Sequence, residues 1–113
     1  MLEIQERFDT AGYEHIIAAA GINNVHITEA LVGGNAVGYI AYAYEAERTV
    51  VYDYSDGGDL MLCDGLVRSV MLKSAMKGIE TMAFEFTDKN KQPSCCLFRL
   101  SYTSNSSNLC HYS

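Results

Sequence analysis

Four acidic residues surround the glycine pair Gly57-Gly58, and carboxylates gathered in a loop are the ligands that hard cations prefer. They are Asp53, Asp56, Asp59 and Asp64. Their spacing does not match the Asp-x-Asp/Asn-x-Asp/Asn-Gly pattern with a distal Glu that a calcium-binding EF-hand loop requires. We expect no metal site, and interpret the segment as a solvated turn with a helix cap or, alternatively, as a functional loop.

The four cysteines show no pair with the C-x-x-C spacing of a zinc or thioredoxin-type site. Cys95 and Cys96 are adjacent, whereas Cys63 and Cys110 each stand alone. The three histidines have no partners at ligand spacing. We therefore expect reduced cysteines that serve mainly in packing.

Five of the eight tyrosines fall in segments that are otherwise apolar, at positions 39, 42, 44, 52 and 54. Aromatic side chains on strands commonly pack against helices. The alternative is that they form a substrate wall or a dimer surface.

Periodicity predicts the elements that must position these residues. Alternation of apolar and polar residues predicts strands, whereas the apolar stripe of Leu62, Leu66, Val67 and Val70 predicts a helix. A shorter helix ends at Gly21, with Asp9 or Thr10 expected as its cap. The predicted strands are 2–8, 25–32, 36–44, 49–54 and 80–86; the predicted helices are 11–20, 60–77 and 93–100; and residues 102–112 are a short hairpin or tail.

The element order is β-α-β-β-β-α-β-α, which is a mixed α+β fold in a single domain over residues 1–113. Three consecutive strands form an antiparallel meander. The helix at 60–77 then connects strand 49–54 to strand 80–86, and such a crossover is right-handed and makes its two strands parallel.

Charge and hydropathy exclude several classes of function. Fourteen acidic and eight scattered basic residues give a net charge of −6, which argues against nucleic acid as a partner. No apolar run reaches the roughly 18–20 residues that span a bilayer. The first residues are acidic and alternating, unlike a secretory signal, so we expect a cytoplasmic protein that does not bind membranes.

Two stretches resemble the GNAT superfamily of acyl-CoA-dependent N-acetyltransferases. Residues 66–80, LVRSVMLKSAMKGIE, are similar to the amphipathic central helix that ends in Gly-Ile before the next strand. Asn90 followed by residues 97–102, LFRLSY, is similar to a later family motif. The element order also fits, and the resemblance covers about residues 25–102.

The resemblance implies an acetyl-CoA site and an amine acceptor, either a small molecule or a peptide. In this fold the cleft opens where strand 49–54 separates from strand 80–86, so Glu85 is the expected general base for the amine. The residues expected to contact the cofactor are Tyr52, Asp53, Tyr54, Leu62, Cys63, Asp64, Gly65 and Asn90.

The sequence departs from the family at the turn that binds the CoA pyrophosphate. The family carries Arg/Gln-x-x-Gly-x-Gly/Ala there, whereas this chain has Gly58 at the first position and Met61 and Cys63 at the small-residue positions. Asp56, Asp59 and Asp64 add three carboxylates beside a site for an anion. We therefore expect weak CoA binding.

A second departure concerns the acid that protonates the leaving thiolate. The position of the family's tyrosine is Phe98, which has no hydroxyl, and Tyr102 lies four residues further on. Two hypotheses follow. The chain is an acetyltransferase-like protein that acts on a small amine or a peptide amine, or it is a non-catalytic GNAT-like module for ligand binding or homodimerisation.

Overall fold

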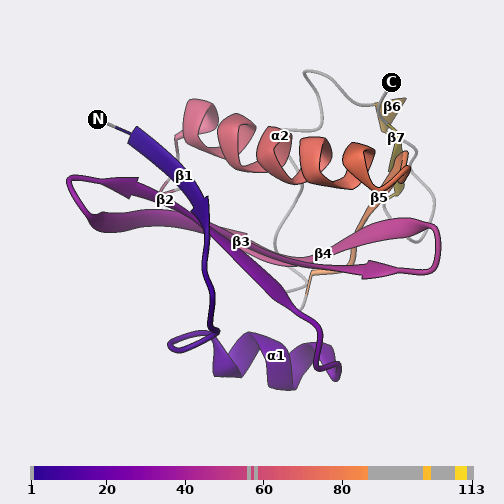
Figure 1. Ribbon diagram of the computed structural model, residues 1–113, viewed down its shortest axis with the longest axis horizontal. Helices are drawn as coiled ribbons and strands as arrows, with labels where there is room; N and C mark the ends of the chain where they lie inside the picture. The colour runs from indigo at the N-terminus through magenta and orange to yellow at the C-terminus, as the bar shows by residue number, and fades with distance from the viewer. Residues whose placement is uncertain (1, 56, 58, 87–100, 103–108, 112–113) are drawn as a thin grey trace.

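In the part of the chain that it describes, a computed structural model shows a seven-stranded mixed sheet with one helix on each face (Figure 1). The structure describes residues 2–55, 57, 59–86, 101–102 and 109–111. The predicted helix at 93–100 lies outside these residues. The elements in chain order are β1 (Leu2–Glu6), α1 (Glu14–Ala20), β2 (His26–Val32), β3 (Asn35–Glu45), β4 (Arg48–Ser55), α2 (Leu60–Met76), β5 (Thr81–Phe84), β6 (Ser101–Tyr102) and β7 (Leu109–His111).

The strand order in the sheet is β1-β2-β3-β4-β5-β7-β6. Strands β1 to β4 are antiparallel neighbours, and β4 pairs with β5 in parallel. The crossover predicted for the helix at 60–77 is therefore confirmed. Strands β6 and β7 pair antiparallel beside β5, which confirms the hairpin alternative for the end of the chain.

Strands β2 and β3 are joined by a tight hairpin turn. Val32 pairs with Asn35, so Gly33 and Gly34 form a two-residue turn. Both glycines have positive φ, 59° and 85°. Two-residue turns of this kind match the right-handed twist of the strands they join, and glycine adopts positive φ without steric cost.

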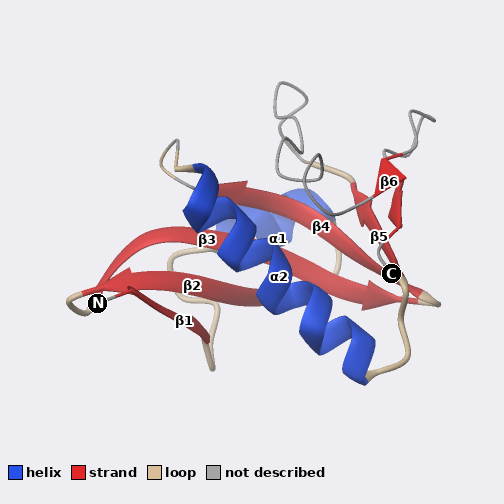
Figure 2. Cartoon of the chain, turned by 90° about the horizontal axis from the view of Figure 1, so that it is seen from above, coloured by secondary structure: helices blue, strands red, loops and turns tan. Residues whose placement is uncertain are grey.

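Each face of the sheet carries its own apolar core, and Figure 2 shows α2 lying across the sheet with α1 behind it. The α2 face is the larger and includes Ile40, Tyr42, Leu66, Val70 and Phe84, all at most 2% exposed. The α1 face is smaller; Ile16 of α1 packs there with residues of β2, β3 and β4. The strand tyrosines are mostly packing residues, since Tyr42 and Tyr52 are buried and Tyr39, Tyr44 and Tyr54 are half-buried.

Gly38 of β3 lies where the sheet approaches the first turn of α2. A Cβ atom there would stand 2.7 Å from Leu62 Cδ2 and 2.7 Å from the Ser55 carbonyl oxygen. Glycine thus permits a close contact among β3, the end of β4 and the beginning of α2.

The prediction for α1 was wrong at its beginning. The helix starts at Glu14, and Tyr13, the N-cap, makes no side-chain cap hydrogen bond. The Asp9 carboxylate accepts hydrogen bonds from Ala11 N and the Arg7 guanidinium instead. It therefore stabilises the preceding loop rather than the helix terminus.

Candidate active site

The parallel strands β4 and β5 pair over only half of β4. The register runs from Arg48–Thr81 to Val51–Phe84, and Glu85 N then donates to the Val51 carbonyl oxygen. β4 continues to Ser55, beyond the end of this ladder. The described part of the chain thus confirms that the two strands pair at one end and that the register stops before the last residues of β4.

A β-bulge lies in β4 at the position where the pairing with β5 ends. Ala41 of β3 pairs with Asp53, but Tyr42 pairs with Val51, so Tyr52 is an extra residue. An extra residue lets two consecutive side chains point to the same face of a sheet. Tyr52 packs in the α1-face core, and Asp53 accepts a hydrogen bond from Tyr39, which also packs there.

Two buried carboxylates lie on this α1 face, on β2 and β4. Glu29 and Asp53 are each 7% exposed. The Tyr13 hydroxyl donates to Glu29 at 2.5 Å, and the Tyr39 hydroxyl donates to Asp53 Oδ2 at 2.7 Å. The two tyrosine rings are in contact, with centroids 5.0 Å apart. These four side chains form what we call the acidic tyrosine cluster.

The phenols of this cluster remain donors over the whole physiological pH range. Burial, followed by the hydrogen bond to Glu29, raises the pKa of Tyr13 far above its usual range. Burial, followed by the hydrogen bond to Asp53, does the same for the pKa of Tyr39. Each phenol therefore stays a neutral hydrogen-bond donor to its carboxylate.

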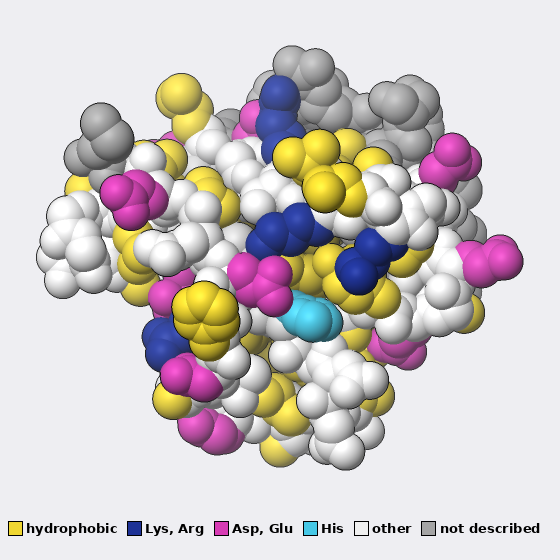
Figure 3. Space-filling view, in the orientation of Figure 1, with side chains coloured by type: hydrophobic (Ala, Val, Ile, Leu, Met, Phe, Trp, Pro, Cys, Tyr) yellow, Lys and Arg dark blue, Asp and Glu magenta, His cyan; other side chains and the backbone are white. Residues whose placement is uncertain are grey.

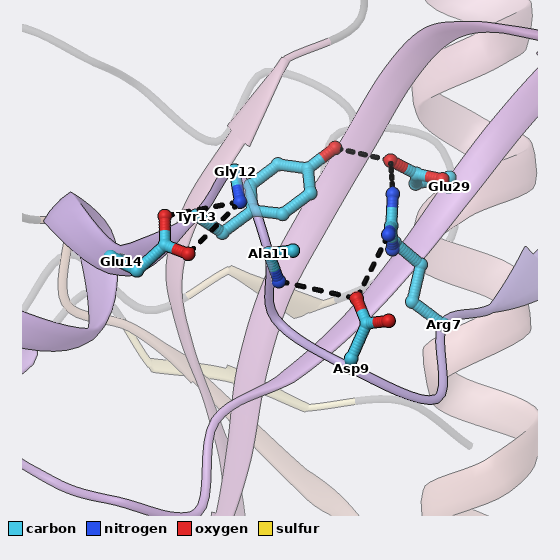
Figure 4. A network of polar contacts seen from close by, with 7 residues as sticks. All are labelled: Arg7, Asp9, Ala11, Gly12, Tyr13, Glu14 and Glu29. Carbon is cyan, nitrogen blue, oxygen red and sulfur yellow. Dashed lines mark hydrogen bonds and ion pairs between the residues drawn. The ribbon is translucent and has the colours of Figure 1, made fainter.

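The loop before α1 closes over Glu29 and carries further charges, as Figure 4 shows. Arg7 lies 3.4 Å from Glu29 and 2.8 Å from Asp9. Both carboxylate oxygens of Glu14 accept from Gly12 N, at 3.0 and 3.2 Å. The loop thus places one guanidinium between two carboxylates, those of Glu29 and Asp9.

Glu85, the predicted base, follows β5 at the end of the parallel pairing. Its side chain is exposed and lies 3.6 Å from the Arg48 guanidinium. Phe84 and Phe86 on either side of it pack in the α2-face core, so Glu85 belongs to the opposite, α1 face. Tyr52, on the same face, donates a hydrogen bond to Glu45.

The beginning of α2 carries its own carboxylate. Asp59 is the N-cap, and its Oδ1 accepts from the amides of Met61 (2.9 Å) and Leu62 (3.2 Å). Amides at a helix N-terminus are the groups that bind phosphates. Here a side chain of the same helix already occupies two of them, which confirms the helix cap expected in the acidic turn.

The other predicted cofactor residues of α2 point into the protein or toward a partner. Leu62 and Cys63 are core residues, 6% and 0% exposed. Gly65 faces Ile4 of β1, since a Cβ there would be 3.8 Å from Ile4 Cδ1. Asp64 forms an ion pair with Arg68 at 2.7 Å, four residues along the helix. Their side chains are used in packing and pairing.

Tyr54 lies on the α2 face, with its ring 5.3 Å from that of Phe86. Tyr52 and Asp53 thus face the α1 side of the sheet at the bulge, whereas Tyr54 faces the α2 side. Asn90, Phe98 and the side chain of Tyr102 lie outside the described residues. Within the described part of the chain, no three His, Cys, Asp or Glu side chains gather as a metal site.

The sequence analysis singled out Tyr39 among the strand tyrosines but did not identify Glu29, Tyr13 or Arg7. A signal for Glu29 was present: Val25, Ile27 and Glu29 alternate along one face of a strand, so the third places a charge on an apolar face. Such a position requires partners. The partners of Glu29, Arg7 and Tyr13, lie in the loop between β1 and α1, which local spacing does not reveal.

The element order, the parallel β4–β5 pair and the flanking helices define the fold of the GNAT acetyltransferases. No protein-family model matches the sequence, and no curated protein is significantly similar to it. Solved structures are similar in fold at 10% sequence identity.

Three such structures are acetyltransferases. The ribosomal-protein-S18-alanine N-acetyltransferase of Escherichia coli has a TM-score of 0.60 and covers 94% of this chain, which spans 70% of it. PaiA N-acetyltransferase of Thermoplasma acidophilum, in complex with coenzyme A, has a TM-score of 0.56, and the match covers 86% of this chain and 64% of that protein. A GNAT family acetyltransferase of Elizabethkingia anophelis with acetyl-CoA bound has a TM-score of 0.62, and the match covers 97% of this chain and 92% of that protein.

Proposed function

We propose that this chain is an acyl-CoA-dependent N-acetyltransferase-like protein whose acceptor is a small amine or a peptide amine. The observation that carries the proposal is the bulge at Tyr52, where the β4–β5 register ends and Asp53 and Glu85 occupy the same face of the sheet. The similarity in fold to acetyltransferases with coenzyme A or acetyl-CoA bound supports it.

The acceptor side of the site suits a cation. Two carboxylates lie on the α1 face: Asp53 receives a hydrogen bond from the neutral Tyr39, whereas Glu29 receives one from Tyr13 and also pairs with Arg7. A protonated amine gains more from such fixed carboxylates than from water-exposed ones, because the surroundings screen them less. We assign Asp53 to binding and orienting the amine.

The chemistry requires a proton acceptor, because an ammonium group has no lone pair with which to attack an acyl carbon. Glu85 is an exposed carboxylate on the same face and is assigned as this base. Arg48, 3.6 Å away, holds the carboxylate in position. When bound, acyl-CoA supplies the activated acyl group.

The beginning of α2 is poorly suited to the pyrophosphate of CoA. The amides of Met61 and Leu62 already donate hydrogen bonds to the Asp59 carboxylate. A phosphate must compete with that carboxylate for the same donors and is repelled by its charge. We expect a dissociation constant for acetyl-CoA no better than about 0.1 mM, or about −5.5 kcal/mol.

A thiol-release assay tests the proposal, with acetyl-CoA and three acceptors: an alkyl monoamine, a polyamine and a peptide with a free N-terminus. Glu85→Gln should lower kcat by about 10²-fold, and Asp53→Asn should mainly raise KM for the amine. Glu80→Gln, which removes an exposed carboxylate elsewhere, is the matched control and should change neither. Absence of acetylated product by mass spectrometry with every acceptor would refute the enzymatic proposal.

The Asp59 cap favours a second candidate, a non-catalytic GNAT-like module that binds a ligand or forms a homodimer. A fold that no longer binds CoA has no use for free amides at this turn, and a carboxylate cap stabilises the helix instead. Calorimetry with acetyl-CoA separates the candidates. Saturation at millimolar concentration favours the enzyme, and no heat of binding at about 5 mM favours the module.

Neither helix in the described part of the chain has the length and hydrophobicity of a membrane span.

A further inference from the structure

A groove of about 500 Å³ lies at the opposite end of α2 from Asp59. It runs between the last turns of α2 and the ends of β1, β2 and β3, and is separate from the acidic tyrosine cluster on the other face. Its volume is within the range of small-molecule sites. The residues that line it are Glu6, His26, Tyr44, Lys73, Met76 and Lys77.

The groove is cationic in a chain whose net charge is −6. Two ammonium groups meet one carboxylate: Lys73 Nζ lies 3.0 Å from Glu6, which also contacts His26 Nδ1 at 3.1 Å. Figure 3 shows this face, with basic side chains gathered beside a histidine and an acidic group. Burial favours the neutral form of Glu6, but hydrogen bonds from Lys73 and His26 outweigh it and lower the pKa of this carboxyl.

Lys77 is the unbalanced charge of the groove. In the part of the chain that the structure describes, the three arginines and Lys73 each have a carboxylate within ion-pair distance. Lys77 instead stands over the ring of Tyr44, 4.9 Å from its centroid. An ammonium held against a ring keeps its charge and its donors available to an anion.

The floor of the groove is aromatic. The His26 ring stacks on Tyr42 at 5.5 Å with an angle of 23°, and lies 5.3 Å from Tyr44. Met76 at the rim is 79% exposed. A thioether and aromatic faces together favour a flat apolar body.

We propose that this groove binds a small monocarboxylate with a planar apolar body. The carboxylate pairs with Lys77 and the neighbouring Lys73, and the planar body lies against Tyr44 and Met76. Glu6 makes the site selective, because its negative charge opposes a dianion such as phosphate more than a single carboxylate. Binding in this groove does not depend on acetyl transfer.

Amide chemical-shift titration of the full chain with benzoate tests the proposal. Benzamide is the neutral analogue of the same shape, and inorganic phosphate is the anion without a ring. Benzoate should shift the signals of His26, Tyr44 and Lys73 with a dissociation constant on the order of 1 mM. Benzamide and phosphate should bind at least about ten-fold more weakly.

Two variants locate the site. Lys77→Gln should weaken benzoate by at least about five-fold, whereas Arg68→Gln, on the same helix and exposed, should change it less than two-fold. Met76→Ala should weaken benzoate but not acetate. The proposal would be overturned if benzamide or phosphate bound as tightly as benzoate, or if Lys77→Gln left benzoate binding unchanged. It would also be overturned if benzoate caused no chemical-shift changes up to about 20 mM.

Discussion

Replacing Gly38 by alanine should destabilise the protein, because the new Cβ has no space. It would stand 2.7 Å from both Leu62 Cδ2 and the Ser55 carbonyl oxygen, 0.7 Å inside the shortest ordinary contact of 3.4 Å. The leucine side chain can rotate, but the carbonyl belongs to the backbone at the end of β4. Relief of that contact therefore requires β3 to move away from β4 and α2.

The expected loss follows from measured costs of overpacking. Extra methyl groups in tight cores cost about 1–3 kcal/mol, and alanine returns about 0.4–1 kcal/mol by restricting the unfolded chain. We expect the free energy of unfolding to fall by about 1–2 kcal/mol. Urea denaturation followed by circular dichroism measures it as a lower midpoint with an unchanged slope.

Gly65→Ala is the matched control for this prediction. Its Cβ would lie 3.8 Å from Ile4 Cδ1, an ordinary contact, in the interior of α2. Alanine is favoured over glycine there by about 0.5–1 kcal/mol, so this variant should be as stable as the parent or more stable. A Gly38→Ala protein within 0.5 kcal/mol of the parent, or a Gly65→Ala protein that loses more, would refute the packing argument.

Three further predictions follow. Asp59→Asn keeps the helix cap but removes its charge, so acetyl-CoA affinity measured by calorimetry should rise about two- to ten-fold, less at 0.5 M salt, while Glu80→Gln leaves it unchanged. Ser74→Ala should lower the free energy of unfolding by about 1–3 kcal/mol in urea denaturation, because it leaves the buried Thr49 hydroxyl, 2.6 Å from Ser74 Oγ, without this partner. If the Ser74→Ala, Thr49→Val double variant lost as much free energy as the two single variants together, the coupling would be contradicted. Burial raises the pKa of Tyr42 to about 12, so the unfolded chain ionises this phenol first and stability should be lost as pH rises from about 10 to 12; urea midpoints that do not fall over this range would contradict the shift.

The sequence predicted best the elements whose pattern reflects burial. The stripe of α2 and the alternation of β2 to β5 follow directly from which side chains face a core, and the crossover rule then determined the parallel pair. Element ends were less predictable. β1 ends at Glu6 rather than at residue 8, and α1 begins three residues late because Asp9 serves the loop.

The strand region that forms the candidate site could be predicted from the sequence, but the roles of its charged side chains could not. The region of Tyr52 to Tyr54 was expected from the resemblance, whereas the bulge depends on the register between β3 and β4. Which aspartate acts at the beginning of α2 depends on where the helix starts: Asp59 caps it, and Asp64 pairs with Arg68. The four-residue spacing of that ion pair is the spacing at which opposite charges on a helix meet.

The two faces of the sheet differ in how firmly their helices are held. α1 has seven residues, no side-chain cap at its N-terminus and one fully buried side chain, Ile16. A helix of this length is not stable by itself, so its order depends on that packing. Its amides should exchange with solvent water through local opening at far lower free energy than those of α2. The acidic tyrosine cluster therefore lies beside the less stable layer of the fold. Under the proposed function, opening of this one short segment would expose the cluster to the acceptor while the core on the opposite face stays closed.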